Sequence, residues 1–196
     1  MIIDPGLYSY IQSPVYDYYH SSLAHNMLIA DSLPGSADIK NTGLSGITRY
    51  YQEFDKYGSY SGAIEMTHSL YKQDGIEVYR QFFFPGGHEM VIRDVACSKD
   101  DHTYRQLFHL APEAIITKTK DGFFIRWEEH SNYLVIRSKI DNFSIIKGQK
   151  HPLQGWYFPS FNQIEEAPVL IWRNWGKVAN SRPGFQSVFL IVLKKR

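Results

Sequence analysis

Cysteine is almost absent from this chain, because Cys97 is the single one among 196 residues. No intrachain disulfide can therefore form, and no Cys-x-x-Cys pair is present for metal binding or redox chemistry. A lone cysteine is most often a small buried apolar residue, so we assign no chemistry to Cys97. With 43% hydrophobic residues, the chain can still build a substantial core without disulfides.

The chain also lacks an excess of charge of either sign. Its 21 Lys and Arg residues balance 20 Asp and Glu residues and leave a net charge of +1. A nucleic-acid-binding domain normally carries a basic patch or a high isoelectric point, so we predict no nucleic-acid partner. We interpret the basic residues at 194–196 as a solubilising tail after the last strand.

Long hydrophobic runs are missing as well. No apolar stretch reaches the roughly 18 residues that predict a transmembrane helix, and no charged-then-apolar leader precedes Asp4. We therefore expect neither a membrane span nor a signal peptide in this sequence.

Several motifs of enzyme classes are not found either. The sequence has no Gly-rich phosphate loop and no Gly-x-Ser-x-Gly, and it offers no opposing acid pair for a two-carboxylate glycosidase. Six further histidines show no metal-ligand spacing, and we interpret them as ordinary strand and turn residues: His68, His88, His102, His109, His130 and His151.

What the chain does contain is alternation with a period of two. Phe123, Ile125 and Trp127 fall on one face of an extended segment, and the intervening residues fall on the other. Asp121-Gly122 precedes them, and Asp-Gly is a strong hairpin turn signal. Aromatic residues make up 15% of the chain, which suits packing across pleated strands.

Similar apolar segments recur along the chain, each bounded by Gly, Asn, Asp or Pro. They lie at 76–84, 88–96, 104–110, 114–119, 132–139, 143–147, 169–172 and 185–193. Short strands at even spacing predict an all-β fold, a two-layer antiparallel β-sandwich, forming one domain over residues 1–196. No segment shows a sustained helical period, and residues 31–46 and 152–166 are predicted to be loops.

An acid and an imidazole stand out near the N-terminus. Asp4 follows a short apolar run and precedes a Pro-Gly turn, and His25 opens a second apolar run. Entering from two neighbouring strands, they could hold one zinc ion, although zinc usually takes three or four ligands. The alternative is that Asp4 caps the turn and His25 is a hydrogen-bonded strand residue, and spacing alone favours this second reading.

The first 31 residues resemble the start of the C-terminal domain of the heparinase II/III-like polysaccharide lyases. In that family a strand ending in Asp-x-Gly-x-Tyr is followed by an aromatic-rich loop and an Ala-His-Asn motif. The matching residues here are Asp4, Gly6, Tyr8, Tyr19, Ser21, Ala24, His25, Asn26 and Asp31. Met27 and Ser32 depart from the usual Thr and Gly, and a looser pattern continues along nearly the whole chain.

The resemblance implies an N-terminally incomplete β-sandwich domain of a lyase that cleaves uronic-acid-containing polysaccharide by β-elimination. It implies zinc at Asp4 and His25, with one metal ligand in a His-x-His-x-Asp segment that this chain lacks. The catalytic groups of the family lie on a preceding helical domain, so no catalytic residue is expected in this chain. The expected partners are that helical domain and an acidic polysaccharide such as a glycosaminoglycan or alginate, and a full-length parent is expected to be periplasmic or secreted.

Aromatic residues surround the candidate site in sequence, and ring faces are suited to pyranose sugars. We take five of them as candidate substrate-binding residues: Tyr8, Tyr10, Tyr18, Tyr19 and His20. Tyrosines beside strands are more often packing residues with a solvated hydroxyl. Two other functions stay open, a non-catalytic carbohydrate-binding module and a purely structural sandwich.

Overall fold

The computed structural model describes residues 1–31, 46–54, 56, 60–127, 132–138, 142–176 and 185–195. Its chain divides into two compact units, which are treated separately below. Unit 1 comprises Met1–Lys40, His102–Ala114 and Ile140–Trp175, and unit 2 comprises Asn41–Asp101, Ile115–Lys139 and Gly176–Arg196. The prediction of one domain over residues 1–196 stays a prediction.

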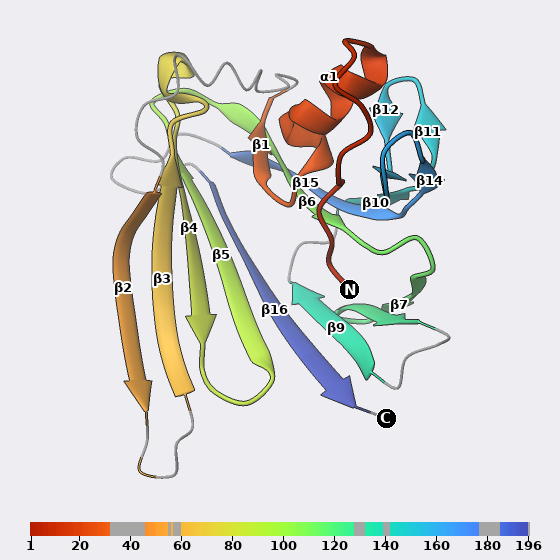
Figure 1. Cartoon of the computed structure of the whole chain (residues 1–196). Coiled ribbons are helices and arrows are strands. Elements are labelled where there is room, and N and C mark those ends of the chain that lie inside the picture. The colour runs from red at the N-terminus through yellow and green to blue at the C-terminus, as the bar shows by residue number, and fades with distance from the viewer. Residues whose placement is uncertain are drawn as a thin grey trace. The chain divides into compact units, whose positions relative to one another are not determined.

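Unit 1 is built on a four-stranded antiparallel sheet (Figure 1). Its strands, in spatial order, are β1 (Leu28–Ala30), β6 (His102–His109), β15 (Val169–Gly176) and β10 (Phe143–Ile146). Two short ribbons accompany it, β11 (Gln149–Lys150) with β12 (Leu153–Gln154) and β13 (Trp156–Tyr157) with β14 (Glu165–Glu166). The predicted loop 152–166 therefore contains three two-residue strands, β12, β13 and β14.

A helix in unit 1 corrects the expectation that the chain has none. Helix α1 (Pro14–His20) is followed by the 3₁₀ turn η1 (Ser22–Ala24). The Ser13 side chain accepts a hydrogen bond from the Tyr16 amide at 3.1 Å, and Pro14 occupies the first turn. Both are standard helix-start signals, but seven largely aromatic residues are too few to reveal a helical period.

Unit 2 is an eight-stranded antiparallel sheet with long strands lying side by side (Figure 1). In spatial order they are β2 (Gly46–Phe54), β3 (Tyr60–His68), β4 (Glu77–Phe84), β5 (Glu89–Cys97), β16 (Phe185–Lys195), β9 (Asn132–Ser138), β8 (Gly122–Arg126) and β7 (Ile115–Thr119). The 3₁₀ turn η2 (Lys72–Asp74) precedes β4. The structure thus confirms the all-β antiparallel class expected of a β-sandwich.

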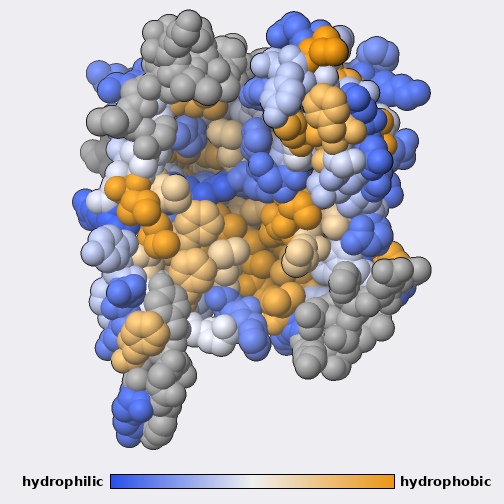
Figure 2. Space-filling model, in the orientation of Figure 1, coloured by the Kyte–Doolittle hydropathy of each residue, from blue (hydrophilic) through white to orange (hydrophobic). Residues whose placement is uncertain are grey.

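Burial alternates along the strands of unit 2 as the sequence predicts. Phe123 and Ile125 are buried in β8, and Phe189 and Ile191 are buried in β16 next to exposed Val188. Apolar side chains gather over β5 and β16 on one face of this sheet (Figure 2). The sequence pattern predicts neither β2 nor β3. For β2 the reason is that it is an edge strand whose residues are mostly exposed on both faces. Most of the predicted loop 31–46 lies outside the described residues.

One ion pair is buried among these apolar side chains. The Arg80 guanidinium donates to both carboxylate oxygens of Asp94, at 2.7 and 2.9 Å, from the neighbouring strand. Asp94 is fully buried, so its charge requires this two-point partner. Burial and the nearby Arg80 cation lower the pKa of His68 on β3.

None of the helices in the described part of the chain has the length and hydropathy to span a membrane.

The turn into β8 gives a stability test. Gly122 has φ +147°, and a Cβ there would lie 1.9 Å from the Ile136 carbonyl oxygen on β9. We expect Gly122→Ala to lower the free energy of unfolding by at least about 2 kcal/mol, through backbone strain and the clash. Chemical denaturation followed by circular dichroism measures this change.

Gly75 provides the matched control, since its φ is also positive, +73°, but no atom lies within 4 Å of an added Cβ. Gly75→Ala should cost only about 1 kcal/mol of left-handed backbone energy. Equal losses in the two variants would contradict the close approach of β8 and β9.

Candidate functional site

The two residues singled out by the N-terminal motif meet in unit 1. Nδ1 of His25 donates to Oδ1 of Asp4 at 2.9 Å, and both side chains are partly exposed. His25 follows η1 in extended backbone, three residues before the start of β1. Asp4 lies in the N-terminal segment, which forms an isolated bridge to Leu110 through Ile2 and is not a full strand. Asp4 and His25 thus meet through a direct side-chain hydrogen bond, although Asp4 does not lie on a strand.

Asn26 holds the two segments together. Its amide nitrogen donates to the Ile3 carbonyl at 2.7 Å, and its amide oxygen accepts from the His109 backbone nitrogen at 2.7 Å. The Ile3 amide in turn donates to the His109 carbonyl at 2.9 Å. This arrangement fixes the residue before Asp4 onto the end of β6, next to the residue that follows His25.

The Pro5-Gly6 turn is fixed from the other side. Gly6 has φ +83° and lies so close to Phe158 that an added Cβ would be 2.2 Å from the Phe158 carbonyl oxygen. The Phe158 amide donates to the Pro5 carbonyl at 2.7 Å. Only glycine fits such a conformation at this distance, which explains the need for glycine two residues after Asp4.

An aromatic cluster supports this turn. Tyr18 and Tyr19 of α1 are buried with Ala24 and Phe158, and Tyr8 packs against them. The Tyr8 and Tyr19 rings each lie 5.6 Å from the Phe158 ring. Burial raises the pKa of Tyr18 to about 12, and the Tyr19 hydroxyl donates to the Ser9 carbonyl. These two tyrosines therefore serve packing in this structure.

The remaining aromatic candidates are at the surface. Tyr10 is 77% exposed, and its ring lies 5.9 Å from that of exposed Phe161. His20 stacks on Tyr16 at 4.0 Å, and its Nδ1 donates to the Tyr16 carbonyl at 2.9 Å. These side chains could meet a ligand without any change in the packing of α1.

His109 is a buried polar residue that we did not single out from the sequence. It is 2% exposed at the end of β6, and its Nε2 lies 3.3 Å from the side-chain nitrogen of Gln154, which also donates to Leu23. Burial, with a smaller contribution from nearby His25, lowers the pKa of His109 to about 3. The imidazole is thus neutral, and Nδ1 finds no hydrogen-bond partner among the described residues.

A metal ion would find only part of a ligand set here. In the described ranges, no third His, Cys, Asp or Glu joins Asp4 and His25 in a group that could hold a metal ion. Two ligand atoms on one tetrahedral zinc are about 3.3 Å apart, given metal–ligand distances of about 2.0–2.1 Å. The observed 2.9 Å separation is close to this value, so the pair fits two positions of such a site.

The family model for the heparinase II/III-like C-terminal domain matches residues 1–173. The chain belongs to this family. A search of curated proteins found no match.

Solved structures with the same fold extend the comparison for this heparinase II/III-like domain. The heparan sulfate lyase HepC of Pedobacter heparinus superposes with a TM-score of 0.70 at 16% identity, over 98% of this chain and 28% of that chain. A heparinase III gene product gives 0.69 at 15% identity, over 100% and 28%. A further heparinase III structure gives 0.64 at 11% identity, over 91% and 24%. The chain thus spans about a quarter of the length of these proteins.

The residues predicted from the sequence of this heparinase II/III-like domain differ in where the structure places them. Asp4 and His25 are in contact, but their role as zinc ligands stays a prediction. Tyr8, Tyr10 and His20 stay candidates for substrate binding. Tyr18 and Tyr19 are placed in the core of unit 1, so a direct sugar contact would require α1 to open.

Neutral His109 predicts a pH dependence of stability. Its folded pKa of about 3 lies below the ordinary value of 6.5, so below pH 6.5 the unfolded chain binds a proton that the folded chain does not. The free energy of unfolding should therefore fall as the pH drops from about 6.5 toward 3, by up to about 1.4 kcal/mol per pH unit from this group. Urea denaturation at several pH values measures the slope.

His109→Gln should flatten this slope. His88, an exposed histidine in unit 2, supplies the control, and His88→Gln should leave the slope unchanged. Identical slopes in wild type and His109→Gln would show that His109 is not the buried neutral group.

Proposed function

We propose that this chain is the β-sandwich domain of a polysaccharide lyase that cleaves uronic-acid-containing glycans by β-elimination. The family match over residues 1–173 carries the proposal. The fold of heparan sulfate lyase HepC and of the heparinase III proteins supports it. Direct contact of Asp4 and His25 at the motif positions is a second support.

Elimination needs three groups around the uronic acid. A base removes the C5 proton, an acid protonates the leaving oxygen, and hydrogen-bond donors neutralise the carboxylate in the transition state. The described residues of unit 1 offer a carboxylate–imidazole pair and exposed aromatic rings. The base and the acid belong to a further part of a longer lyase, so this chain by itself holds sugar and does not cleave it.

Asp4 and His25 hold a divalent metal ion, with zinc the best fit to one carboxylate oxygen and one imidazole nitrogen. An ion bound there would be held by Asp4 Oδ1 and His25 Nδ1, which lie 2.9 Å apart. When bound, it supplies positive charge at the edge of the site. Asn26 and Gly6 keep the two ligand side chains in position, through the contacts to Ile3, His109 and Phe158.

Zinc binding tests this pair. We expect purified wild-type chain to bind zinc, and Asp4→Ala and His25→Ala each to weaken the affinity at least about tenfold, because each removes one of the two proposed ligands. Competition with a chromogenic chelator gives the affinities, and metal analysis gives the stoichiometry.

His20→Ala is the control, since this imidazole is exposed and bonded to the Tyr16 carbonyl without a carboxylate partner. It should bind zinc as wild type does. Zinc affinity that ignores both Asp4→Ala and His25→Ala would remove the metal assignment.

Glycan binding and the absence of cleavage test the function itself. We expect heparan sulfate oligosaccharides to bind the chain, and Tyr10→Ala to weaken this binding about threefold to tenfold, the range for loss of one aromatic stacking contact. Ile11→Ala, at a similarly exposed apolar neighbour, is the control. Calorimetric titration measures the affinity.

The ultraviolet absorbance of the unsaturated uronate product is followed in the same mixtures. It should stay constant with this chain alone. Growth of that absorbance would show that the chain carries its own base and acid, and binding without dependence on Tyr10 would remove the unit 1 surface from the proposal.

A further inference from the structure

The exposed face of the unit 2 sheet carries an ordered row of side chains that the function proposed above does not use. Strand register places Tyr51, Ala63, Phe83, Val91 and Leu190 side by side on β2, β3, β4, β5 and β16. We call these five residues the aromatic row. Tyr51 is 55% exposed and Phe83 is 38% exposed, whereas the alternate residues Ile92 and Phe189 are buried on the opposite face.

The two rings of the aromatic row are separated by two strand spacings. Neighbouring strands lie about 4.8 Å apart, so the rings of Tyr51 and Phe83 are offset by about 10 Å across the sheet. Flat apolar rings at intervals along a line are suited to the faces of successive pyranose units. The row runs across the strands, so a linear chain could follow it over five strands.

A second row of polar side chains runs parallel to the first. It consists of Arg49, Glu65, Gln81 and Arg93, one pair of residues further along the same strands. Gln81 donates to Glu65 at 2.5 Å and accepts from Arg93 at 2.6 Å. The hydrogen bonds from Gln81 and from the Thr48 hydroxyl, with the nearby Arg49 and Arg93 cations, lower the pKa of Glu65. The polar row is therefore preorganised across the face.

Positive charge is available at one end of this surface. Arg93 donates to the neutral amide oxygens of Gln81 and Gln186, at 2.6 and 2.9 Å. Arg137 continues the aromatic row on β9, opposite Leu190, and is exposed. Arg93 is near enough to Glu65 for its charge to help lower the pKa of that carboxyl. Across the described part of the chain, neither Arg93 nor Arg137 forms a direct ion pair, so both guanidinium groups can meet an anionic ligand.

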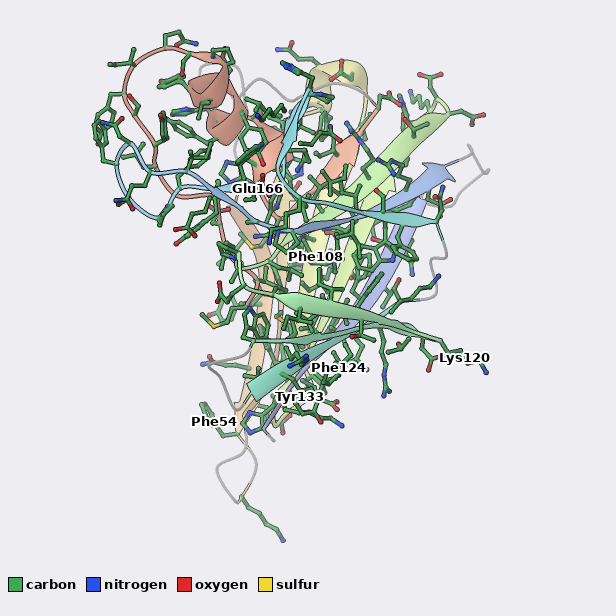
Figure 3. All side chains as sticks on the ribbon, turned by 90° about the vertical axis from the view of Figure 1, so that its right-hand side faces the viewer. Phe54, Phe108, Lys120, Phe124, Tyr133 and Glu166 are labelled. Carbon is green, nitrogen blue, oxygen red and sulfur yellow. The ribbon has the colours of Figure 1, made fainter. Side chains whose placement is uncertain are left out.

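Aromatic side chains continue past the arginines on the same face. Phe124 on β8 and Tyr133 on β9 lie next to one another, with ring centroids 4.9 Å apart (Figure 3). Phe124 is the register partner of Val135, and Tyr133 lies two residues from Val135 along β9. Val135 pairs on its other side with Val192 of β16. The face thus presents rings on both sides of Arg93 and Arg137.

We propose that this face of the unit 2 sheet is a second binding surface for an acidic glycan. Tyr51 and Phe83 stack on sugar rings, and Arg93 and Arg137 bind carboxylate or sulfate groups. A protein partner fits less well, because a stable interface covers about 800 Å² per partner with an apolar centre. Here the aromatic row is bordered on one side by hydrogen-bonded polar groups, Glu65, Gln81 and Arg93. The proposal shares only the class of ligand with the proposed function and uses no residue of unit 1.

Titration of the whole chain with heparan sulfate oligosaccharides of defined length tests this surface. The Tyr51→Ala/Phe83→Ala double variant should bind about tenfold or more weakly at the unit 2 surface. Arg93→Gln with Arg137→Gln should weaken binding and reduce its dependence on salt, because two contacts to carboxylate or sulfate groups are lost. Asp4→Ala and Tyr10→Ala should leave this second binding event unchanged.

Tyr50→Ala is the matched control. Tyr50 is 76% exposed on the same strand as Tyr51, but its side chain points to the opposite face. Unchanged binding in the Tyr51/Phe83 and arginine variants, or an equal loss in Tyr50→Ala, would overturn the proposal. Equal binding of a neutral glucan oligosaccharide would overturn the acidic ligand, and self-association abolished by Phe83→Ala would assign the face to a second copy of the chain.

Discussion

The side-chain amide of Asn26 is the contact on which the candidate site depends. It donates to the Ile3 carbonyl and accepts from the His109 backbone nitrogen, both at 2.7 Å. An amide can do both at once, whereas an ionised carboxylate can only accept. Since Asn26 follows His25 directly, one dipeptide supplies the imidazole and also fixes the segment that carries Asp4. The segment that carries Asp4 is therefore held by the Asn26 side chain and by the hydrogen bond from the Ile3 amide to the His109 carbonyl.

The fold was predictable where a strand has one buried and one exposed face. In β8 and β16 the hydrophobic period is two, and the burial of Phe123, Ile125 and Phe189 follows it. The same reasoning fails at β2, since an edge strand exposed on both faces carries no such pattern. Helix α1 was missed for a different reason: its start signals at Ser13 and Pro14 were readable, but its length hides the period.

The site was predictable only in part. The sequence pattern allows Asp4 and His25 to meet, but their spacing alone favours separate turn and strand roles, and the motif resemblance is what favours the pair. The burial of His109 depends on Gln154 and Leu23, which are distant in sequence, so a polar residue in an apolar run was read as an ordinary strand residue. Aromatic composition alone does not distinguish a sugar-stacking surface from a core, and Tyr18 and Tyr19 lie in the core of unit 1.

Net charge likewise does not predict where charged side chains gather on the surface. A balance of +1 excludes a strong field around the whole chain, yet register on β5, β16 and β9 brings Arg93 and Arg137 to one face of unit 2. Arg93 differs from a salt-bridged arginine in the groups that accept its hydrogen bonds. Arg80 is neutralised by Asp94 in the interior, while Arg93 is held by the amide oxygens of Gln81 and Gln186. Neutral acceptors fix the direction of the Arg93 guanidinium without a direct ion pair, although its charge also acts on nearby Glu65. The same residue type is therefore structural in one place and accessible for recognition in the other.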